Sequence, residues 1–140
     1  MNRKVLLDTG PLVALLNKND RHHSWTRERF AEIEPPLLTC EAVVVEACHL
    51  LRHHPHGERI VLDVLHRGAV EIRFSLQEEI VPVQRLRIRY AKVPMDLADA
   101  CLVRMAELYA ESVILTLDSD FTIYRMHGRQ VVPTLTPKGI

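Results

Sequence analysis

The sequence predicts an α/β fold with a central, mostly parallel sheet covered by helices on both faces. Short runs of Val, Ile and Leu alternate along the chain with segments of helical period. This alternation is typical of strand–helix–strand units with right-handed crossovers. Acidic residues follow two of the apolar runs, and the carboxyl ends of parallel strands are where such sheets place their ligand crevice. The same pattern therefore predicts both the fold and the position of a site.

Each expected element follows from local composition and period. Short apolar runs bounded by turn residues indicate strands, whereas apolar positions spaced by three and four residues indicate helices. We expect strands at residues 5–7, 37–39, 70–72, 113–116 and 131–132, the last at an edge of the sheet. We expect one helix directly after the first strand and further helices at residues 25–33, 41–52, 58–66, 76–90 and 95–110.

Capping residues and prolines set several of these boundaries. Thr9 or Gly10 is expected to cap the first helix, with Pro11 in the first turn, where proline is tolerated. A proline pair ends the next helix before the second strand. Pro82 leaves the extent of the helix over 76–90 open, because proline disrupts a helix interior.

Length and composition predict a single domain over residues 1–140. The 140 residues are 47% hydrophobic, which is enough for one sizeable core, and no apolar run approaches the length of a membrane span. We therefore expect a cytoplasmic protein with no membrane association. The 18 basic residues balance 18 acidic ones, so a polyanion would have to be bound by a local patch. Three cysteines without CxxC spacing are expected to be buried free thiols: Cys40, Cys48 and Cys101.

Four acidic residues lie at positions that predict a shared site. Asp8 and Asp118 follow apolar runs, whereas Glu46 and Asp99 each interrupt the apolar face of an expected helix. A carboxylate on a core-facing stripe is costly to bury without a partner. No Arg or Lys lies three or four residues from Glu46, and none lies four residues from Asp99. Clustered carboxylates of this kind are stabilised together by a divalent cation.

Taken alone, each acid also has an ordinary interpretation. Asp96 is a candidate N-cap, which would put Asp99 in the first turn of its helix, and the other acids suit surface or helix-end positions. Convergence of all four on one crevice favours a metal site instead. Oxygen ligands favour Mg²⁺ or Mn²⁺ over zinc, with one ion or a pair. Asp96 and Asp120 are candidate additional ligands.

Four segments together resemble the PIN-domain nucleases, in particular VapC-type toxins of toxin–antitoxin pairs: LLDTGPLVALL, VVVEACHLL, DLADACLVRMA and ILTLDSDF. The resemblance covers most of the chain. It implies a three-layer α/β/α domain and hydrolysis of RNA by an enzyme that depends on Mg²⁺ or Mn²⁺. The acids and flanking hydroxyl residues of the family match Asp8, Glu46, Asp99, Asp118, Thr9 and Thr116.

The chemistry we expect is metal-activated hydrolysis of an RNA phosphodiester. Asp8, Asp99 and Asp118 would bind the ion directly or through water, and Glu46, itself a candidate ligand, would orient or deprotonate the attacking water. The sequence contains no P-loop and no Ser-His-Asp arrangement, and its glycines are too scattered to cradle a nucleotide. Covalent catalysis is therefore not expected.

The resemblance also implies partners, namely an RNA substrate, an antitoxin protein and a second copy of the chain. Arg85, Arg89 and Lys92 recur at helical spacing and would form a basic stripe for RNA, although a solvated helix face explains them equally well. An antitoxin arginine entering the acidic pocket would displace the metal. In a homodimer, exposed Leu side chains or Trp25 on the first two helices would supply the contact surface.

Three other functions fit parts of the same pattern. A strand-end Asp also suits a phosphoacceptor, but aspartyl-phosphate phosphatases need a DxD pair, whereas Thr and Gly follow Asp8. A non-catalytic module that binds RNA or protein would use the acids to hold arginine side chains. A nuclease of RNA processing would use the same site without an antitoxin.

Histidines and aromatic residues carry weaker signals. His49 and His53 are four residues apart and would suit zinc, but no ordered third ligand accompanies them. Phe121, Tyr124 and Trp25 are expected in the core or at an interface rather than as platforms for base stacking, because aromatics make up only 5% of the chain.

Overall fold

The fold is described by a computed structural model that covers residues 3–140, so that Met1 and Asn2 of the predicted domain lie outside the described residues. Its main sheet has five strands: β1 (Val5–Leu7), β2 (Leu37–Thr39), β3 (Val70–Ile72), β4 (Val113–Leu115) and β7 (Thr134–Leu135). All neighbouring pairs are parallel, and the order is β3-β2-β1-β4-β7. The predicted parallel α/β fold is confirmed.

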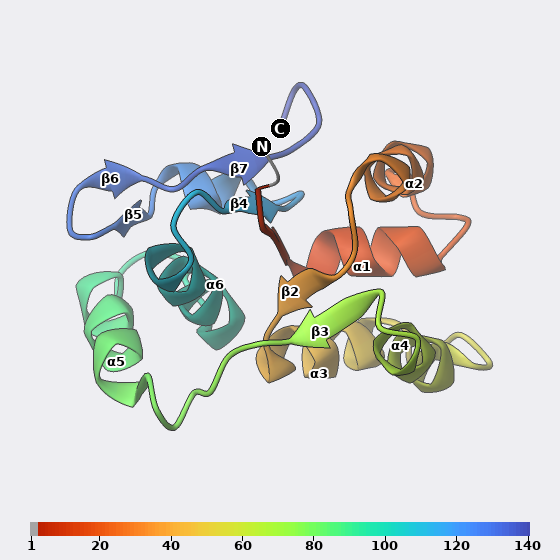
Figure 1. The fold of residues 1–140 in the computed structure, drawn as a ribbon, viewed down its shortest axis with the longest axis horizontal. Helices are drawn as coiled ribbons and strands as arrows, with labels where there is room; N and C mark the ends of the chain where they lie inside the picture. The colour runs from red at the N-terminus through yellow and green to blue at the C-terminus, as the bar shows by residue number, and fades with distance from the viewer. Residues whose placement is uncertain (1–2) are drawn as a thin grey trace.

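Helices cover the sheet on both sides in a three-layer α/β/α arrangement. Figure 1 shows α5 and α6 on the opposite side of the sheet from α1 and α2, and α3 packs against α1, α4 and α6. Within residues 3–140 no helix has the length and apolar character needed to cross a bilayer. The helices are α1 (Thr9–Leu16), α2 (His23–Glu32), α3 (Glu41–Leu50), α4 (Gly57–His66), α5 (Ile80–Arg89) and α6 (Leu97–Leu108).

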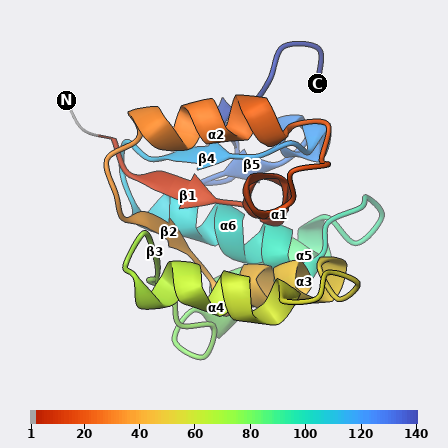
Figure 2. The same cartoon turned by 90° about the vertical axis from the view of Figure 1, so that its right-hand side faces the viewer.

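The central strands β1 and β4 are apolar because both of their faces are covered. Leu6, Leu7, Ile114 and Leu115 have no exposed surface, as expected for parallel strands between two helix layers. Figure 2 shows α2 on one side of these strands and α6 on the other. The two strands pair in register, with Leu7 beside Leu115, so the residues that follow them emerge at the same edge of the sheet.

Several predicted helix boundaries shift by a few residues. The N-cap of α1 is Asp8 rather than Thr9 or Gly10, because the Asp8 side chain accepts a hydrogen bond from the first N–H of the helix. Helix α2 begins at His23, two residues before the predicted start, and α3 ends at Leu50, two residues before the predicted end.

Helix α5 differs more from its prediction over residues 76–90. It begins at Ile80, and residues 76–79 form a turn instead. Pro82 therefore lies in the first turn of the helix, where its missing N–H costs no intrahelical hydrogen bond. The proline that made this segment ambiguous marks its start.

The prediction that residues 131–132 form an edge strand of the main sheet is wrong. Val131 belongs to β6 (Gln130–Val131), which pairs antiparallel with β5 (Arg125–Met126) in a separate two-stranded ribbon. The edge of the main sheet is instead β7, beside β4. A two-residue apolar run signals extended backbone, but its composition does not specify which strand it pairs with.

Candidate active site

Asp8 lies at the carboxyl end of β1 and is only 6% exposed. Its Oδ1 accepts a hydrogen bond of 2.8 Å from the Thr9 backbone N–H, which starts α1. Its Oδ2 accepts a hydrogen bond of 2.7 Å from the Thr116 hydroxyl. Both partners are neutral, so they orient the carboxylate without cancelling its charge.

Thr116 connects the two acids that follow the central strands. Its hydroxyl donates to Asp8 and accepts a hydrogen bond of 2.9 Å from the Asp118 backbone N–H. Asp118 Oδ1 in turn accepts a hydrogen bond of 2.8 Å from the Asp120 N–H, which caps the short 3-10 helix Ser119–Thr122. The pairing of β1 with β4 brings these acids together, and Thr116 fixes their relative positions.

The start of α6 contributes two further acids, Asp96 and Asp99. Asp96 Oδ1 accepts a hydrogen bond of 2.8 Å from the Asp99 N–H, and Asp99 Oδ2 accepts a longer one of 3.4 Å from the Asp96 N–H. This reciprocal pair is a capping box, so the predicted N-cap role of Asp96 is confirmed. The same cap holds Asp99, which is 6% exposed, at the edge of the site.

Tyr124 is a site residue that the sequence analysis assigned only to the core or an interface. Its ring is fully buried, while its hydroxyl lies 2.9 Å from Asp99 Oδ2 and 2.8 Å from the Pro94 carbonyl oxygen. The hydroxyl donates its one proton to either acceptor and so anchors Asp99 to the loop before α6. Tyr124 and Asp99 are 25 positions apart, and this separation conceals their contact at the sequence level.

Glu46 reaches the site from α3 and is half-buried. Its Oε1 accepts a hydrogen bond of 2.6 Å from the Thr9 hydroxyl, which ties α3 to the start of α1. Val43 on the same helix face is buried as predicted, but Leu50 is 50% exposed because the helix ends there. The apolar stripe that Glu46 was predicted to interrupt therefore ends at the pocket rim.

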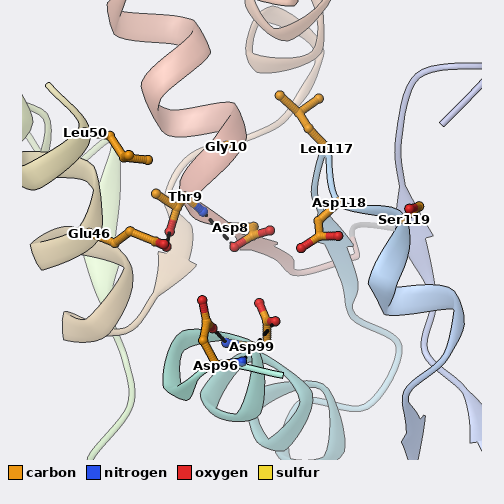
Figure 3. Close-up of a pocket in the computed structure, with 10 residues that line it drawn as sticks. All are labelled: Asp8, Thr9, Gly10, Glu46, Leu50, Asp96, Asp99, Leu117, Asp118 and Ser119. Atoms are coloured by element: carbon orange, nitrogen blue, oxygen red, sulfur yellow. Dashed lines mark hydrogen bonds between the residues drawn. The ribbon is translucent and has the colours of Figure 1, made fainter. Parts of the chain in front are cut away.

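These side chains line one pocket with a volume of about 390 Å³ (Figure 3). Its lining has no basic side chain, and no ion pair within residues 3–140 involves one of its acids. Figure 3 shows carboxylates from α3, from the start of α6 and from the ends of β1 and β4 around a common space. The five acids of the lining are Asp8, Glu46, Asp96, Asp99 and Asp118.

Burial and mutual repulsion raise the pKa of two of these acids. Burial, opposed by hydrogen bonds and reinforced by the charges of Asp118 and Glu46, raises the pKa of Asp8 to about 6. Burial and then the charge of Asp96 raise the pKa of Asp99 to about 7. Ionising both near neutral pH is therefore costly unless a cation offsets their charge.

The donor set fits a hydrated divalent cation. It consists of carboxylate and hydroxyl oxygens, which Mg²⁺ and Mn²⁺ prefer. In the part of the chain that the structure describes, no three His, Cys, Asp or Glu side chains are close enough together to hold an ion directly. Mg²⁺ commonly keeps several waters and takes only one or two carboxylates directly, so this spacing suits it better than a closed zinc site.

Asp120, a candidate additional ligand, does not line the pocket. Its backbone N–H holds Asp118, and its pKa is raised by burial and by the charge of Asp118. Phe121 and Tyr124 pack edge to face with ring centroids 5.3 Å apart, which fixes this turn against the core. The structure thus gives Asp120 a contact with a site residue rather than a place in the pocket.

The predicted basic stripe is not continuous. Arg85 and Arg89 are exposed on α5, but the helix ends at Arg89 and Lys92 lies in the turn that follows. The three side chains therefore do not share one helix face. Arg89 instead lies 5.1 Å from the centre of the Tyr90 ring.

Two other predicted groups are also rearranged. His49 is on α3 and His53 is beyond its end, so they do not form a pair on one helix. Trp25 is half-buried, and the Arg29 guanidinium lies over its ring, 5.4 Å from the ring centre. Within residues 3–140, the strongly exposed Leu side chains lie outside α1 and α2. The surface predicted for dimer contact is therefore not exposed in the expected way.

The predicted free cysteines are confirmed in the described chain. Cys40 and Cys101 are buried, whereas Cys48 is only partly buried, and all three are reduced. They take no part in the pocket lining.

Comparison with known proteins agrees with the geometry of this pocket. The family model of the PIN domain matches residues 5–125. The chain belongs to the PIN-domain family. The PIN match spans the four predicted acids, and the family predicted from the sequence motifs is confirmed. The chain is also similar to Ribonuclease VapC26 of Mycobacterium tuberculosis, with 29% identity over 116 residues, which covers 81% of this chain and 86% of that relative.

Proposed function

We propose that this PIN-domain protein is an endoribonuclease dependent on Mg²⁺ or Mn²⁺, and that it is the toxin of a toxin–antitoxin pair. The observation that carries the proposal is the pocket of five carboxylates without a basic side chain. Such a pocket has a charge that a divalent cation would stabilise. Similarity to a protein named Ribonuclease VapC26 supports RNA as the substrate.

Asp8, Asp99 and Asp118 would hold the ion directly or through water, with Glu46 and Asp96 beside them. When bound, the ion lowers the pKa of a coordinated water and offsets charge that develops on the phosphate. Glu46 Oε1 is held by the Thr9 hydroxyl, which leaves Oε2 to accept a proton from the attacking water. Neutral hydrogen bonds from Thr116 and Tyr124 orient Asp8 and Asp99 without competing for their charge.

The RNA would need positive contacts outside the pocket, because the pocket itself repels phosphate. Arg85, Arg89 and Lys92 are exposed on α5 and in the turn that leads to α6, where Asp96 and Asp99 begin the helix. This placement supports the interpretation that they contact RNA phosphates, as separate side chains rather than as one stripe.

The same pocket would also accept an antitoxin. A guanidinium pairs with two carboxylate oxygens at once, so an arginine from a partner protein would fit between these acids and displace the ion. Inhibition would then be competitive with metal. Formation of a homodimer stays a prediction.

The test is cleavage of a mixed pool of tRNA and single-stranded RNA by the purified protein, with Mg²⁺ or Mn²⁺ and with EDTA. We expect cleavage with metal, none with EDTA, and none by the Asp8→Asn variant. Asp63→Asn removes one negative charge from an exposed position on α4 and serves as the matched control. This variant should cut RNA as the wild type does. A folded protein that binds the metal but cuts no RNA would instead be a binding module.

A further inference from the structure

A second surface pocket lies beside the acidic one, at the end of α3. Helix α3 contributes Glu46 and Leu50 to the acidic pocket, and the next residue, Leu51, lines the second. The remainder of the second pocket is formed by the α3–α4 connection and the start of α4, with a volume of about 460 Å³. We call it the α3–α4 pocket. Its basic side chains are Arg52, His54, His56 and Arg59.

The chemistry of the α3–α4 pocket is opposite to that of its neighbour. Arg52 and Arg59 are exposed, and within residues 3–140 neither forms an ion pair. His54 Nδ1 accepts a hydrogen bond of 3.1 Å from the His56 N–H, so a neutral His54 ring carries its proton on Nε2 and can donate. Glu58 is the one acid of the lining. The pocket therefore presents donors and unpaired positive charge.

The turn that assembles these side chains is specific to glycine. A Cβ at Gly57 would overlap the Leu51 carbonyl group, so a larger residue would push the start of α4 away from the end of α3. Four of the eight histidines lie at positions 49, 53, 54 and 56 around this turn. The close packing of the two helix ends thus concentrates basic side chains at one place.

In another pocket, one of the three arginines of the lining is already neutralised. In the pocket beside Arg85 and Arg89, Arg104 lies 2.7 Å from Glu79 and 3.1 Å from Glu107. By contrast, the arginines of the α3–α4 pocket keep their charge available for a ligand. Because that pocket adjoins an acidic site that repels phosphate, its cations are placed to hold a polyanion that reaches the site.

We propose that the α3–α4 pocket binds a backbone phosphate of the RNA substrate, on one side of the bond that is cut. Arg52 and Arg59 provide the charge, and His54 provides a hydrogen bond to a phosphate oxygen. This inference rests on the proposed ribonuclease function. If it is correct, the RNA strand runs from the acidic pocket over the end of α3.

The test compares two double variants of the full chain that lose the same charge. Arg52→Gln with Arg59→Gln alters the α3–α4 pocket, and Arg27→Gln with Arg129→Gln removes two exposed arginines from α2 and the β5–β6 ribbon. Cleavage of a single-stranded RNA is followed with Mn²⁺, and binding is measured by fluorescence anisotropy over a range of salt concentrations. Thermal unfolding checks that both variants fold.

We expect the pocket variant to raise KM about ten-fold with little change in kcat, while the control changes neither. The slope of log affinity against log salt should fall by about 0.7, the value for one phosphate contact on a single strand. Arg59→Glu should weaken binding more than Arg59→Gln, which a purely structural role does not predict. Arg59→Gln alone serves as the test if the double variant does not fold.

Equal KM values for the pocket and control variants, with cleavage intact, would overturn the phosphate site but not the ribonuclease. A wild type that neither binds nor cuts RNA would overturn both.

Discussion

The carboxylates at the two ends of α6 differ in their partners. Near its end, Glu107 accepts hydrogen bonds from Arg104 at 3.1 Å and from the His127 N–H at 2.7 Å, and Arg104 also pairs with Glu79. At its start, the hydrogen bonds that the Asp99 carboxylate accepts within residues 3–140 come from neutral groups, and Asp99 faces a pocket of further acids. The same helix thus contains a neutralised cluster and a charged one.

The presence or absence of a basic partner distinguishes acids that stabilise the fold from acids that would bind a ligand. An acid with a basic partner contributes to stability or is neutral, whereas a buried acid among other acids costs stability in the absence of a cation. The acids at the start of α6 are therefore explained by a ligand, and those near its end are explained by the fold alone. Activity and stability should respond in opposite ways at the two clusters.

The largest expected difference is in activity. Asp99→Asn should lower RNA cleavage at least about a hundred-fold, because it removes charge that stabilises the reacting centre. Glu107→Gln, a matched neutralisation on the same helix, should leave cleavage close to that of the wild type. The rates are compared in steady-state assays with saturating Mn²⁺. Equal losses in both variants would mean that α6 acts as a whole and that the two clusters are not distinct.

Stability should change in opposite directions in the same two variants. In EDTA at about pH 8, Asp99→Asn should raise the free energy of unfolding by roughly 1–2 kcal/mol, because it removes a repelled charge. Glu107→Gln should lower it by roughly 1–3 kcal/mol, since Arg104 loses a charged partner. Denaturant titrations measure both changes. A destabilising Asp99→Asn would indicate that its capping hydrogen bonds outweigh the repulsion.

The pH dependence of stability should follow from the acidic cluster. The pKa values of Asp8 and Asp99 rise from 3.8 to about 6 and about 7 in the folded protein. The folded state therefore binds more protons than the unfolded state, so the stability from these groups is complete at pH values below the unfolded pKa. It is lost as pH rises through the folded pKa values.

Unfolding of the metal-free protein at several pH values, from about pH 4 to about pH 8, tests this dependence. Added Mg²⁺ should restore stability at the upper end of that range by binding the ionised acids. The Asp8→Asn, Asp99→Asn double variant serves as the control and should lose both the decline with pH and the response to Mg²⁺. A decline that persists in the double variant would assign it to other groups.

The smallest expected effect concerns the hydroxyl that orients Glu46. Thr9→Val keeps the shape of the side chain but removes the hydrogen bond to Glu46 Oε1, so kcat should fall about three- to ten-fold without loss of metal binding. Thr122→Val removes an exposed hydroxyl that donates to the Ser119 carbonyl, outside the pocket, and is the matched control. A kcat equal to that of the control would show that α3 positions Glu46 unaided.

Most of the strands and helices were predictable because they depend on local patterns. The strands at 5–7, 37–39 and 70–72 match their predicted limits. The first two are fully buried, and short buried runs bounded by turn residues have few alternatives. The predictions were wrong where one residue has two roles, or where a composition signal does not specify which strand a segment pairs with. Asp8 caps a helix while it also follows a strand, and Val131 pairs with a neighbouring ribbon rather than the main sheet.

The site divides in the same way. Alternation of strands and helices predicts a parallel sheet whose carboxyl ends share one crevice, so the meeting of Asp8 and Asp118 was predictable, although the pairing of β1 with β4 was not. The hydrogen bonds that hold the acids were not, because Tyr124 and Thr9 contact them from elements far away in sequence. Sequence periodicity places a side chain on a face, whereas its hydrogen-bond partner depends on how whole elements pack.

The hydrogen bond between Thr116 and Asp8 joins residues that are 108 positions apart. During translation, the acids at the start of the chain emerge long before β4 and Asp118 exist. The pocket therefore has no complete form in a nascent chain that stops before those residues. If the protein is the ribonuclease proposed here, it cannot cut the messenger that encodes it until β4 and Asp118 have been synthesised.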